Sequence, residues 1–496
     1  MSGSRRCNIL SGVNSNSTPS RRQNAHPCRL GGGRLRFLRT GYPATGRHRS
    51  LVLPLCVLIC FTVACAVTED APEERKLGKC SAASLLPDED ARQVTRELTL
   101  PLDFDPADIG NPLPVLVVDT LDKDVVDEPK IDGVLTLFDT LDGDLLLQTD
   151  IGIELRGGNY SMAFPKKQFG VVTRDADGKK VDVPLLGMPE DDDWVLSSTP
   201  IDRTMMRNHL AYALGRLMGL KAPETRHVEL LLNQSGGPLE IGDYLGLYVL
   251  TEKLTRNPSR LGIDVDGGGF LVELTTTDAV RPDEPHFCAA WAEAPVIVHY
   301  PKKLTPESAQ FQAVEQRIYD LEDAIFSSES SALQRILDQE SAVDYWLLNN
   351  VLLNEDAFVR SVFLYSPDGE RLFFGPAWDF DIAMRLSQAQ LAIHNSDEYQ
   401  WGMGLLKHKF FRQALTERWH LLRQDLLTDA AVSAMIDETW ETIADAALRN
   451  DSRWAAVLSD LVDGMDTPAE KEKDQLHAWL IDRFNWVDDH IDDAVD

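Results

Sequence analysis

The sequence predicts an α+β protein with a β-rich N-terminal half and a helical C-terminal half. Short apolar runs, split by Asp, Gly and Pro turns, fill residues 97–185 and are typical of strands. Apolar residues at helical spacing dominate 401–495. We therefore expect two lobes, a β-rich N-lobe over 97–255 and a mostly helical C-lobe over 256–496.

The N-lobe begins with five predicted strands, and a helix over 202–219 follows them. The strands are ELTLPLDF, LPVLVVDT, GVLTLFDT, DLLLQTDIGIELRG and KQFGVVTRD. In the helix, apolar side chains recur every three or four residues, and Gly219 marks its end. Two further strands, RHVELLLN and YLGLYVLTEKL, complete this half.

The C-lobe opens with one more strand, GGGFLVELT, and an irregular Pro-rich stretch over 280–305. Three helices are predicted after it, and a β segment over 359–377 precedes the helical tail. The three helices span 306–327, 331–338 and 341–354. The tail carries one apolar stripe, made of Trp401, Phe410, Phe411, Leu415, Trp419, Leu422 and Leu426.

The N-terminal region has the composition of an export signal. Residues 1–50 carry ten Arg and no acidic residue, which indicates a disordered basic leader or a start codon assigned too early. The apolar run 51–67 is shorter than the roughly 20 residues of a membrane span, so it reads as the apolar core of a signal peptide, with a tilted anchor as the alternative. It ends near Cys65 in a sequence similar to a lipoprotein cleavage site. A polar linker over 68–96 follows.

Charge and cysteine content limit the function classes. Without the ten leader arginines, 39 basic residues face 79 acidic ones, a formal net charge of −40. Such a chain is not expected to bind nucleic acid electrostatically, and it is expected to stay monomeric. Of seven cysteines, only Cys80 and Cys288 lie beyond Cys65, so at most one internal disulfide is expected, and no Cys/His cluster has zinc spacing.

Several motifs in the N-lobe are compatible with phosphate or nucleotide binding, and each also has an ordinary structural explanation. The Gly turn in RGGNYS, residues 156–161, brings backbone amides close to a ligand or is only a turn. Lys166 or Lys167 is placed to reach phosphate or is a solvated pair. Arg207 contacts phosphate or caps a surface. Glu252, at a strand end, accepts from an adenine or ribose or ends an edge strand.

The most informative pattern is a pair of acidic segments, 354–356 and 378–381, separated by a short β stretch. Phosphoryl transfer to a hydroxyl uses one Asp to orient and deprotonate the acceptor, and another to hold divalent metal. Asp356 and Asp379 supply these groups in the order that a protein kinase uses. Asp381 adds a second carboxylate, and such hard oxygen ligands suit Mg²⁺ or Mn²⁺. Ser361 stands where a kinase catalytic loop carries the Asn that helps to hold a second metal ion, and we expect its hydroxyl to coordinate metal, though less well than an amide oxygen.

With these motifs, residues from about 112 to 490 resemble the spore coat protein H (CotH) kinase-like family. The resemblance implies an atypical protein-kinase-like fold and, in active members, phosphate transfer from ATP with Mg²⁺ or Mn²⁺. It covers most of the mature chain. The matching blocks are RGGNYS, PKKQF, LLGMPEDDDWVLSSTPIDRTMMRNHLAYAL, YLGLYVLTEKL, GGGFLVEL, NEDAFVRSVFLY, FFGPAWDFDIAM and AWLIDRFNWVDDHI.

The resemblance assigns roles to individual residues. Asp356 is similar to the catalytic Asp and Asp379 to the metal-binding Asp. Lys167 resembles the phosphate-binding Lys, with Lys166 as the alternative, and Trp378 lies beside the nucleotide. Two departures from the family pattern are Ser361 in place of Asn and Gly158 as an extra residue in the glycine loop. The block 191–194 is typical of the family and reads as an acidic turn before a core Trp.

Three functions follow as expectations. The first is an exported kinase that phosphorylates Ser or Thr of secreted or surface proteins, using ATP and Mg²⁺ or Mn²⁺. The second is a surface-binding, adhesin-like protein that keeps the fold without catalysis. The third binds nucleotide but transfers another group. The acidic composition favours a basic, Ser-rich protein substrate. The chain is expected in the cell envelope, lipid-anchored at Cys65, or secreted.

Overall fold

The fold is α+β, as the sequence predicts. The computed structural model describes residues 109, 113–140, 143–158, 162–327, 329–385, 400–459, 461 and 467–494. The leader, the apolar run, the linker and the first predicted strand lie outside these residues, as do residues 159–161 of the glycine loop. Among the helices of the described part, none has the length and apolar character that a membrane crossing requires.

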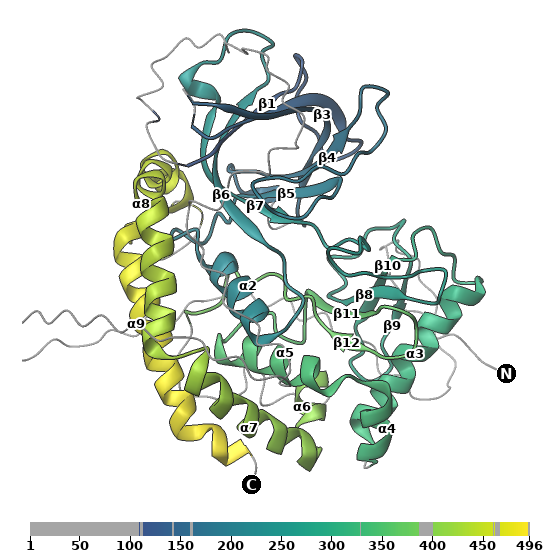
Figure 1. Ribbon diagram of the computed structural model, residues 1–496. Coiled ribbons are helices and arrows are strands. Elements are labelled where there is room, and N and C mark those ends of the chain that lie inside the picture. The colour runs from purple at the N-terminus through teal and green to yellow at the C-terminus, as the bar shows by residue number, and fades with distance from the viewer. Residues whose placement is uncertain are drawn as a thin grey trace, which may run out of the picture. The chain divides into compact units, whose positions relative to one another are not determined.

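Seven strands of the N-terminal half form a closed barrel, with the order β1-β2-β3-β4-β5-β7-β6 (Figure 1). They are β1 (Val115–Asp119), β2 (Ile131–Phe138), β3 (Leu145–Arg156), β4 (Gln168–Arg174), β5 (Asp193–Ser197), β6 (Thr225–Asn233) and β7 (Tyr244–Glu252). Antiparallel pairing links the neighbours, and a parallel pairing of β1 with β6 closes the barrel. β-branched and leucine side chains alternate along these strands and so place one face of each inside.

The barrel interior is apolar and contains one side chain or more from every strand. A representative set is Leu116, Leu135, Ile151, Val171, Trp194, Val228 and Leu250. Trp194 is fully buried, and its indole Nε1 donates to the carbonyl of Asp191. The prediction of an acidic turn before a core Trp is therefore confirmed, whereas the strand β5 that carries this Trp was not predicted.

Helix α2 (Arg207–Met218) crosses from the barrel to the C-terminal half. It begins five residues later than predicted, because the Asp202 carboxylate accepts hydrogen bonds from the backbone N–H groups of Thr204 and Arg207 and holds the preceding residues in turns. It ends at Gly219, as predicted. Gly219 has φ = 107° and its N–H closes the last turn, a conformation that favours glycine.

A second sheet, with the order β12-β11-β8-β10-β9, lies in the C-terminal half. Its strands are β8 (Phe270–Leu274), β9 (His286–Cys288), β10 (Pro295–Tyr300), β11 (Val362–Ser366) and β12 (Phe373–Phe374). The prediction that 280–305 is irregular was wrong, because β9 and β10 occupy part of it. Pro295 stands at the first position of β10, where a missing N–H is tolerated, and the following residues Val-Ile-Val are strong strand formers.

The predicted helices of the C-terminal half are present, within a few residues at each end. They are α3 (Ala309–Phe326), α4 (Ser330–Ile336), α5 (Gln339–Val351), α6 (Trp401–Leu405), α7 (Lys409–Asp425), α8 (Asp429–Ser459), α9 (Ala469–His490) and the 3₁₀ helix η4 (Ile491–Ala494). Helices α8 and α9 run side by side (Figure 1). In the apolar stripe of the tail, Phe410 and Leu426 are half-buried and the other members are buried.

Ion pairs join α8 to the barrel half. Arg449 pairs with the fully buried Glu229 of β6, which also accepts a hydrogen bond from Tyr244. Arg203, ahead of α2, pairs with Asp451. Because these contacts bridge residues more than 200 positions apart, they fix the barrel against the helices and so set the geometry of the segments between them.

Candidate active site

The two acidic segments lie in adjacent loops. Asp356 follows α5, in a loop where its N–H donates to Asn354 Oδ1 and its carbonyl accepts from Val359 and Arg360. Asp379 follows β12. Ser361 Oγ donates to Asp379 Oδ2 over 3.0 Å, and Asn354 Nδ2 donates to the Asp379 carbonyl over 3.2 Å. These two hydrogen bonds tie the loops together.

Helix α2 holds the second loop from the other side. Tyr212 Oη accepts from the backbone N–H of Asp379 over 3.2 Å, and Asn208 Oδ1 accepts from that of Phe380 over 2.7 Å. The Phe380 ring is fully buried and meets Tyr212 edge-on. The loop is therefore positioned by buried packing and by backbone hydrogen bonds, in addition to the contact of the Asp379 carboxylate with Ser361.

Both loops hold non-glycine residues in the left-handed backbone region. The φ values are +59° at Phe358, +54° at Ser361 and +65° at Asp379. Such conformations cost of order 1–3 kcal/mol each and persist only where the surrounding structure enforces them, most often at functional sites. Such residues occur on both sides of the Ser361–Asp379 hydrogen bond. The conformations of both loops are therefore enforced by the surrounding structure, as is common at functional sites.

Burial raises the pKa values of all three carboxyls, and acidic neighbours add to its effect. Burial, and then the charge of Asp379, raise the pKa of Asp356 to about 6. Burial raises the pKa of Asp379, the Ser361 hydrogen bond partly offsets this, and the charge of Glu273 raises it further. The pKa of Asp381 lies well above its usual value, because of burial and then because of Asp379, Asp202 and Asp356. The charge of Asp379 thus disfavours ionisation of Asp356 and Asp381, an effect that a bound divalent cation would offset.

The carboxylates of the acidic loops fit a hard cation that a ligand also coordinates better than a cation coordinated by protein groups alone. Among the described residues, the only three-acid group with converging oxygens is Asp182, Asp191 and Asp192, away from these loops. Lys180 pairs with Asp192, which supplies positive charge there. Mg²⁺ is commonly held by one or two carboxylates together with phosphate oxygens. Asp379 and Asp381 are able to supply the carboxylates.

Arg156, at the end of β3, is a cation near the acidic loops that sequence reasoning missed. Its guanidinium carbon lies 5.2 Å from the centroid of the Trp378 ring, and Trp378 in turn stacks on Tyr212. Burial lowers the pKa of Arg156, and Tyr212 and Asp379 act in the opposite direction. The sequence signal for Arg156 was its position as the first residue of RGGNYS. Its contact with Trp378 was not predictable, because it depends on how the barrel closes.

Arg360 is a second missed cation, four residues after Asp356. Its Nη2 donates to Thr276 Oγ1 over 2.7 Å and to Asp278 Oδ2 over 2.6 Å. Its charge lowers the pKa values of Asp356 and Asp379, against the larger effect of burial. Arg360 therefore lies close enough to both carboxyls to moderate their repulsion.

The two lysines do not join this group. Lys166 is buried, with Nζ donating to the Leu247 carbonyl over 2.6 Å and to the Ser198 carbonyl over 3.2 Å, and burial lowers its pKa to about 7. Lys167 Nζ donates to the Met162 carbonyl over 2.6 Å. Within the described part of the chain, neither amine makes a hydrogen bond to the acidic loops. Their predicted phosphate role stays a prediction.

Arg207 and Glu252 lie in two further polar networks. The Arg207 guanidinium is buried and donates to Asp202, Glu472 and the Ala383 carbonyl, so it braces the loop that follows Asp381. Glu252, at the end of β7, accepts from the Glu224 N–H through Oε2 and faces a cavity. Its predicted contact with adenine or ribose is not tested by the structure.

No curated protein matches the chain. The family model described as CotH kinase protein matches residues 153–487, which include α2, both acidic loops and the helical tail. The match covers most of the chain. The chain belongs to the CotH kinase protein family.

Proposed function

We propose that this protein is an exported, atypical kinase of the CotH type that transfers the γ-phosphate of ATP to Ser or Thr of secreted or surface proteins. The observation that carries the proposal is the joining of the Asp356 loop to Asp379 through Ser361 and Asn354. The barrel and the helical half would act as the two lobes of a kinase-like fold. When bound, ATP supplies the phosphoryl group and Mg²⁺ or Mn²⁺ offsets its charge.

Asp356 would accept the proton of the acceptor hydroxyl. With a pKa of about 6, it is largely ionised at neutral pH and is still a moderately strong base, which is the range in which proton transfer is efficient. Asp379 and Asp381 would hold the metal ion. Ser361 would orient the Asp379 carboxylate through its hydroxyl rather than serve as a full replacement for the kinase Asn.

Arg156 and Trp378 would form the wall of the nucleotide site nearest the barrel. The guanidinium already lies over the Trp378 ring, and Asp379 lies close enough to act on its pKa. We favour Arg156 over Lys166 as the phosphate-facing cation, because the Lys166 amine is bound to two buried carbonyls. Lys167 has one bond to break and is the second choice.

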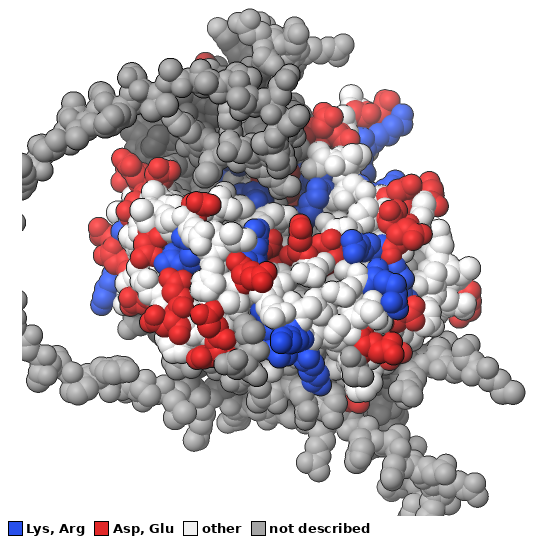
Figure 2. All heavy atoms as spheres, turned by 60° about the horizontal axis from the view of Figure 1, so that its bottom comes forward, with Lys and Arg blue, Asp and Glu red and all other residues white. Residues whose placement is uncertain are grey.

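Export is supported by a disulfide. Cys288 is disulfide-bonded, and such bonds persist mainly in oxidising compartments. The apolar run 51–67 would direct export, followed by lipid anchoring at Cys65 or by release. Figure 2 shows Asp and Glu side chains spread over one face of the molecule, with Lys and Arg scattered among them. This acidic surface supports a basic protein substrate.

A catalytically inactive binding protein on the same fold is the second candidate. The observations that favour it are that α2 has no Glu, the residue that in kinases pairs with the phosphate-binding Lys, and that Lys166 is fully engaged within the barrel half. Binding of a surface ligand by such a protein would require neither nucleotide nor the carboxylates of the acidic loops.

Autophosphorylation of the purified protein with labelled ATP and Mn²⁺ separates the two candidates. The kinase proposal predicts label in the wild type, its loss in Asp356→Ala, and its retention in Asp320→Ala, a matched change at an exposed position of α3. Equal label in all three proteins, or no label on the protein or on added basic peptides, would reject the kinase proposal.

A further inference from the structure

Helix α9 places two charged side chains against the segments that carry the candidate active site. Glu472 and Arg483 lie on the same face of this helix, because about 11 residues make three turns of an α-helix. The apolar residues of that face are buried, and they are Leu476, Leu480, Phe484 and Val487. The face therefore packs into the protein, where a charged group requires hydrogen-bonding partners.

Arg483 binds the end of helix α5, which leads into the Asp356 loop. The side chain is fully buried; its Nε donates to the Val351 carbonyl over 3.0 Å and its Nη2 to the Asn350 carbonyl over 2.8 Å. Burial lowers the pKa of Arg483 to about 10, so it is still a cation at neutral pH. A cation that binds the last carbonyls of a helix also interacts favourably with the helix dipole. Arg483 therefore fixes the last turn of α5.

The chain between α5 and Asp356 has little conformational freedom. Leu353 has φ = 47°, and the N–H of Asn354 returns to the Asn349 carbonyl over 2.9 Å. The Asn354 side chain then accepts from the N–H of Asp356 and donates to the Asp379 carbonyl. A displacement of the last turn of α5 would therefore be passed to Asp356 through contiguous hydrogen bonds.

Glu472 supports the second acidic loop through Arg207. Glu472 Oε1 accepts from Arg207 Nη2 over 3.2 Å, and Arg207 Nε donates to the Ala383 carbonyl over 3.0 Å. The two side chains are 18% and 5% exposed, so water screens this pair only weakly. The next N–H, that of Met384, donates to the Leu352 carbonyl over 2.8 Å. The segment that Glu472 supports is therefore joined to the end of α5.

We propose that α9 positions both acidic loops for phosphoryl transfer. Arg483 is the positioning residue for Asp356, and Glu472 is the positioning residue for the loop of Asp379. Both act through backbone or through another side chain, so neither is a catalytic residue. A misplacement of a reacting group by about 1 Å costs about 100-fold in rate. The effect on rate rests on the proposed kinase function, whereas the effect on the loops does not.

Two substitutions of Arg483 and one matched control test this role. Arg483→Met removes both hydrogen bonds at similar side-chain length, and Arg483→Lys keeps the charge but lacks the guanidinium fork that binds both carbonyls. Arg423→Lys is the control, because Arg423 of α7 also contacts α9, with Asp488, Asp429 and the Leu427 carbonyl as its partners. Far-UV circular dichroism and thermal unfolding establish the temperature at which each variant is folded.

Initial rates with labelled ATP and Mn²⁺ at that temperature separate positioning from stability. We expect kcat to fall about 100-fold in Arg483→Met and about tenfold in Arg483→Lys. The KM for ATP should stay within about twofold, because the loop of Asp379 keeps its bonds to Asn208 and Tyr212. A kcat of folded Arg483→Lys equal to that of wild type, an equal loss in Arg423→Lys, or a loss confined to KM would overturn the proposal.

Amide hydrogen exchange without ATP tests the same contacts independently of catalysis. We expect faster exchange over 352–360 in both Arg483 variants and over 379–384 in Glu472→Ala, with Arg423→Lys unchanged in both segments. If this pattern is found and the wild type transfers no phosphate, the positioning of the loops is supported and the kinase function alone fails. Wild-type exchange over 352–360 in both Arg483 variants, or over 379–384 in Glu472→Ala, would overturn the proposal whatever the activity.

Discussion

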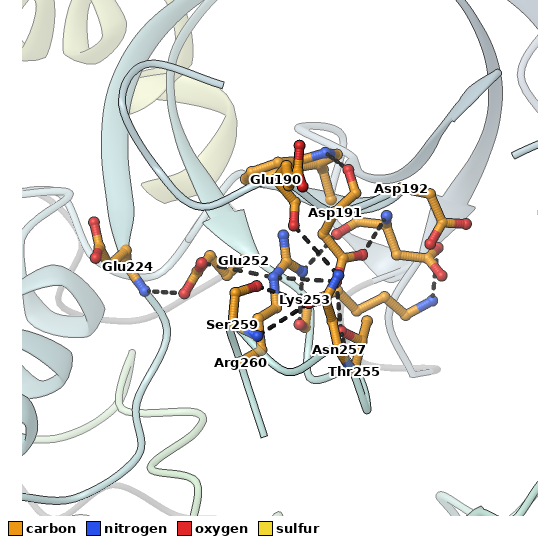
Figure 3. Close-up of polar contacts among 12 residues, drawn as sticks. Glu190, Asp191, Asp192, Glu224, Glu252, Lys253, Thr255, Asn257, Ser259 and Arg260 are labelled. Carbon is orange, nitrogen blue, oxygen red and sulfur yellow. Dashed lines mark hydrogen bonds and ion pairs between the residues drawn. The ribbon is translucent and has the colours of Figure 1, made fainter. Parts of the chain in front are cut away.

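The acidic loops and the ion-pair network of Arg260 with Glu252 and Asp191 (Figure 3) are both polar centres, but their charges are arranged in opposite ways. Around Asp356 and Asp379 like charges are brought together, and each raises the pKa of another. At Arg260, unlike charges neutralise one another. Like charges held close together lower the stability of the fold. This cost is expected at a site that binds a cation and performs catalysis. A neutralised pair needs no such ligand.

The largest expected effect is on phosphoryl transfer. Replacing Asp379 with Ala removes the carboxylate that joins the loops and would hold metal. We expect transfer from ATP to fall by at least about 100-fold, the usual scale for removing one electrostatic group from an active site. Initial rates with labelled ATP and Mn²⁺ measure it. The thermal shift caused by Mn²⁺ with ATP should disappear in the same variant, and its persistence would place the metal elsewhere.

The neutralised centre should respond to mutation through stability instead. Arg260→Met leaves Glu252 and the buried Asp191 without their cation, and it removes two hydrogen bonds to backbone carbonyls. Breaking a buried pair on one side costs about 3–5 kcal/mol. Urea unfolding of Arg260→Met against wild type measures the loss. A loss under about 1 kcal/mol would mean that this pair does not stabilise the fold.

Asp356→Asn should move stability in the opposite direction. Because the pKa of Asp356 is raised to about 6, the folded state binds more protons than the unfolded state between about pH 4 and 6, and stability falls as pH rises through that window. Asn cannot ionise. At pH 7.5 the variant should gain about 1–2 kcal/mol after allowance for solvent screening, and near pH 4 the gain should vanish.

Thermal unfolding of wild type and Asp356→Asn at pH 4 and at pH 7.5, without metal, gives this comparison. In the same window the kinase activity of the wild type should rise with pH as Asp356 ionises. A variant less stable than wild type at pH 7.5 would show that Asp356 stabilises the apo fold and is not a repelled group.

The smallest expected effect concerns Ser361. Ser361→Ala removes one hydrogen bond to Asp379, worth about 1 kcal/mol, and should raise the pKa of Asp379 further. Ser361→Asn is the matched change, because Asn tolerates φ = +54° and has the amide oxygen that kinases use at this place. We expect Ala to lower transfer several-fold and Asn to maintain or raise it. Equal rates for both would remove Ser361 from the mechanism.

The sequence was sufficient for the acidic loops, because the residues that matter there are close in sequence. Asp356 and Ser361 share one loop, and Asp379 follows within one short hairpin of β11 and β12. The helices also followed from periodicity, since apolar spacing along α7 reports the face that packs inward. Strands β9 and β10 were missed, because proline residues hid a short alternating pattern.

The cations could not be chosen from sequence. Lys166 and Lys167 are adjacent, and only the geometry of the closed barrel sends Lys166 inward to the carbonyl of Leu247. Arg156 meets Trp378 across 222 positions of chain, which requires the barrel to close and to contact the C-terminal half. Glu252 and Arg260 are near each other in sequence, but the third member of their network, Asp191, comes from the turn before β5.

The most direct test of the account is phosphosite mapping by mass spectrometry after incubation of the purified protein with ATP and Mn²⁺, for wild type and Asp379→Ala. The account predicts phosphoserine or phosphothreonine in the wild type, on the protein or on an added basic substrate, and none above background in the variant. Identical phosphosites in both proteins, no modification in either, or a different adduct derived from the nucleotide would contradict it.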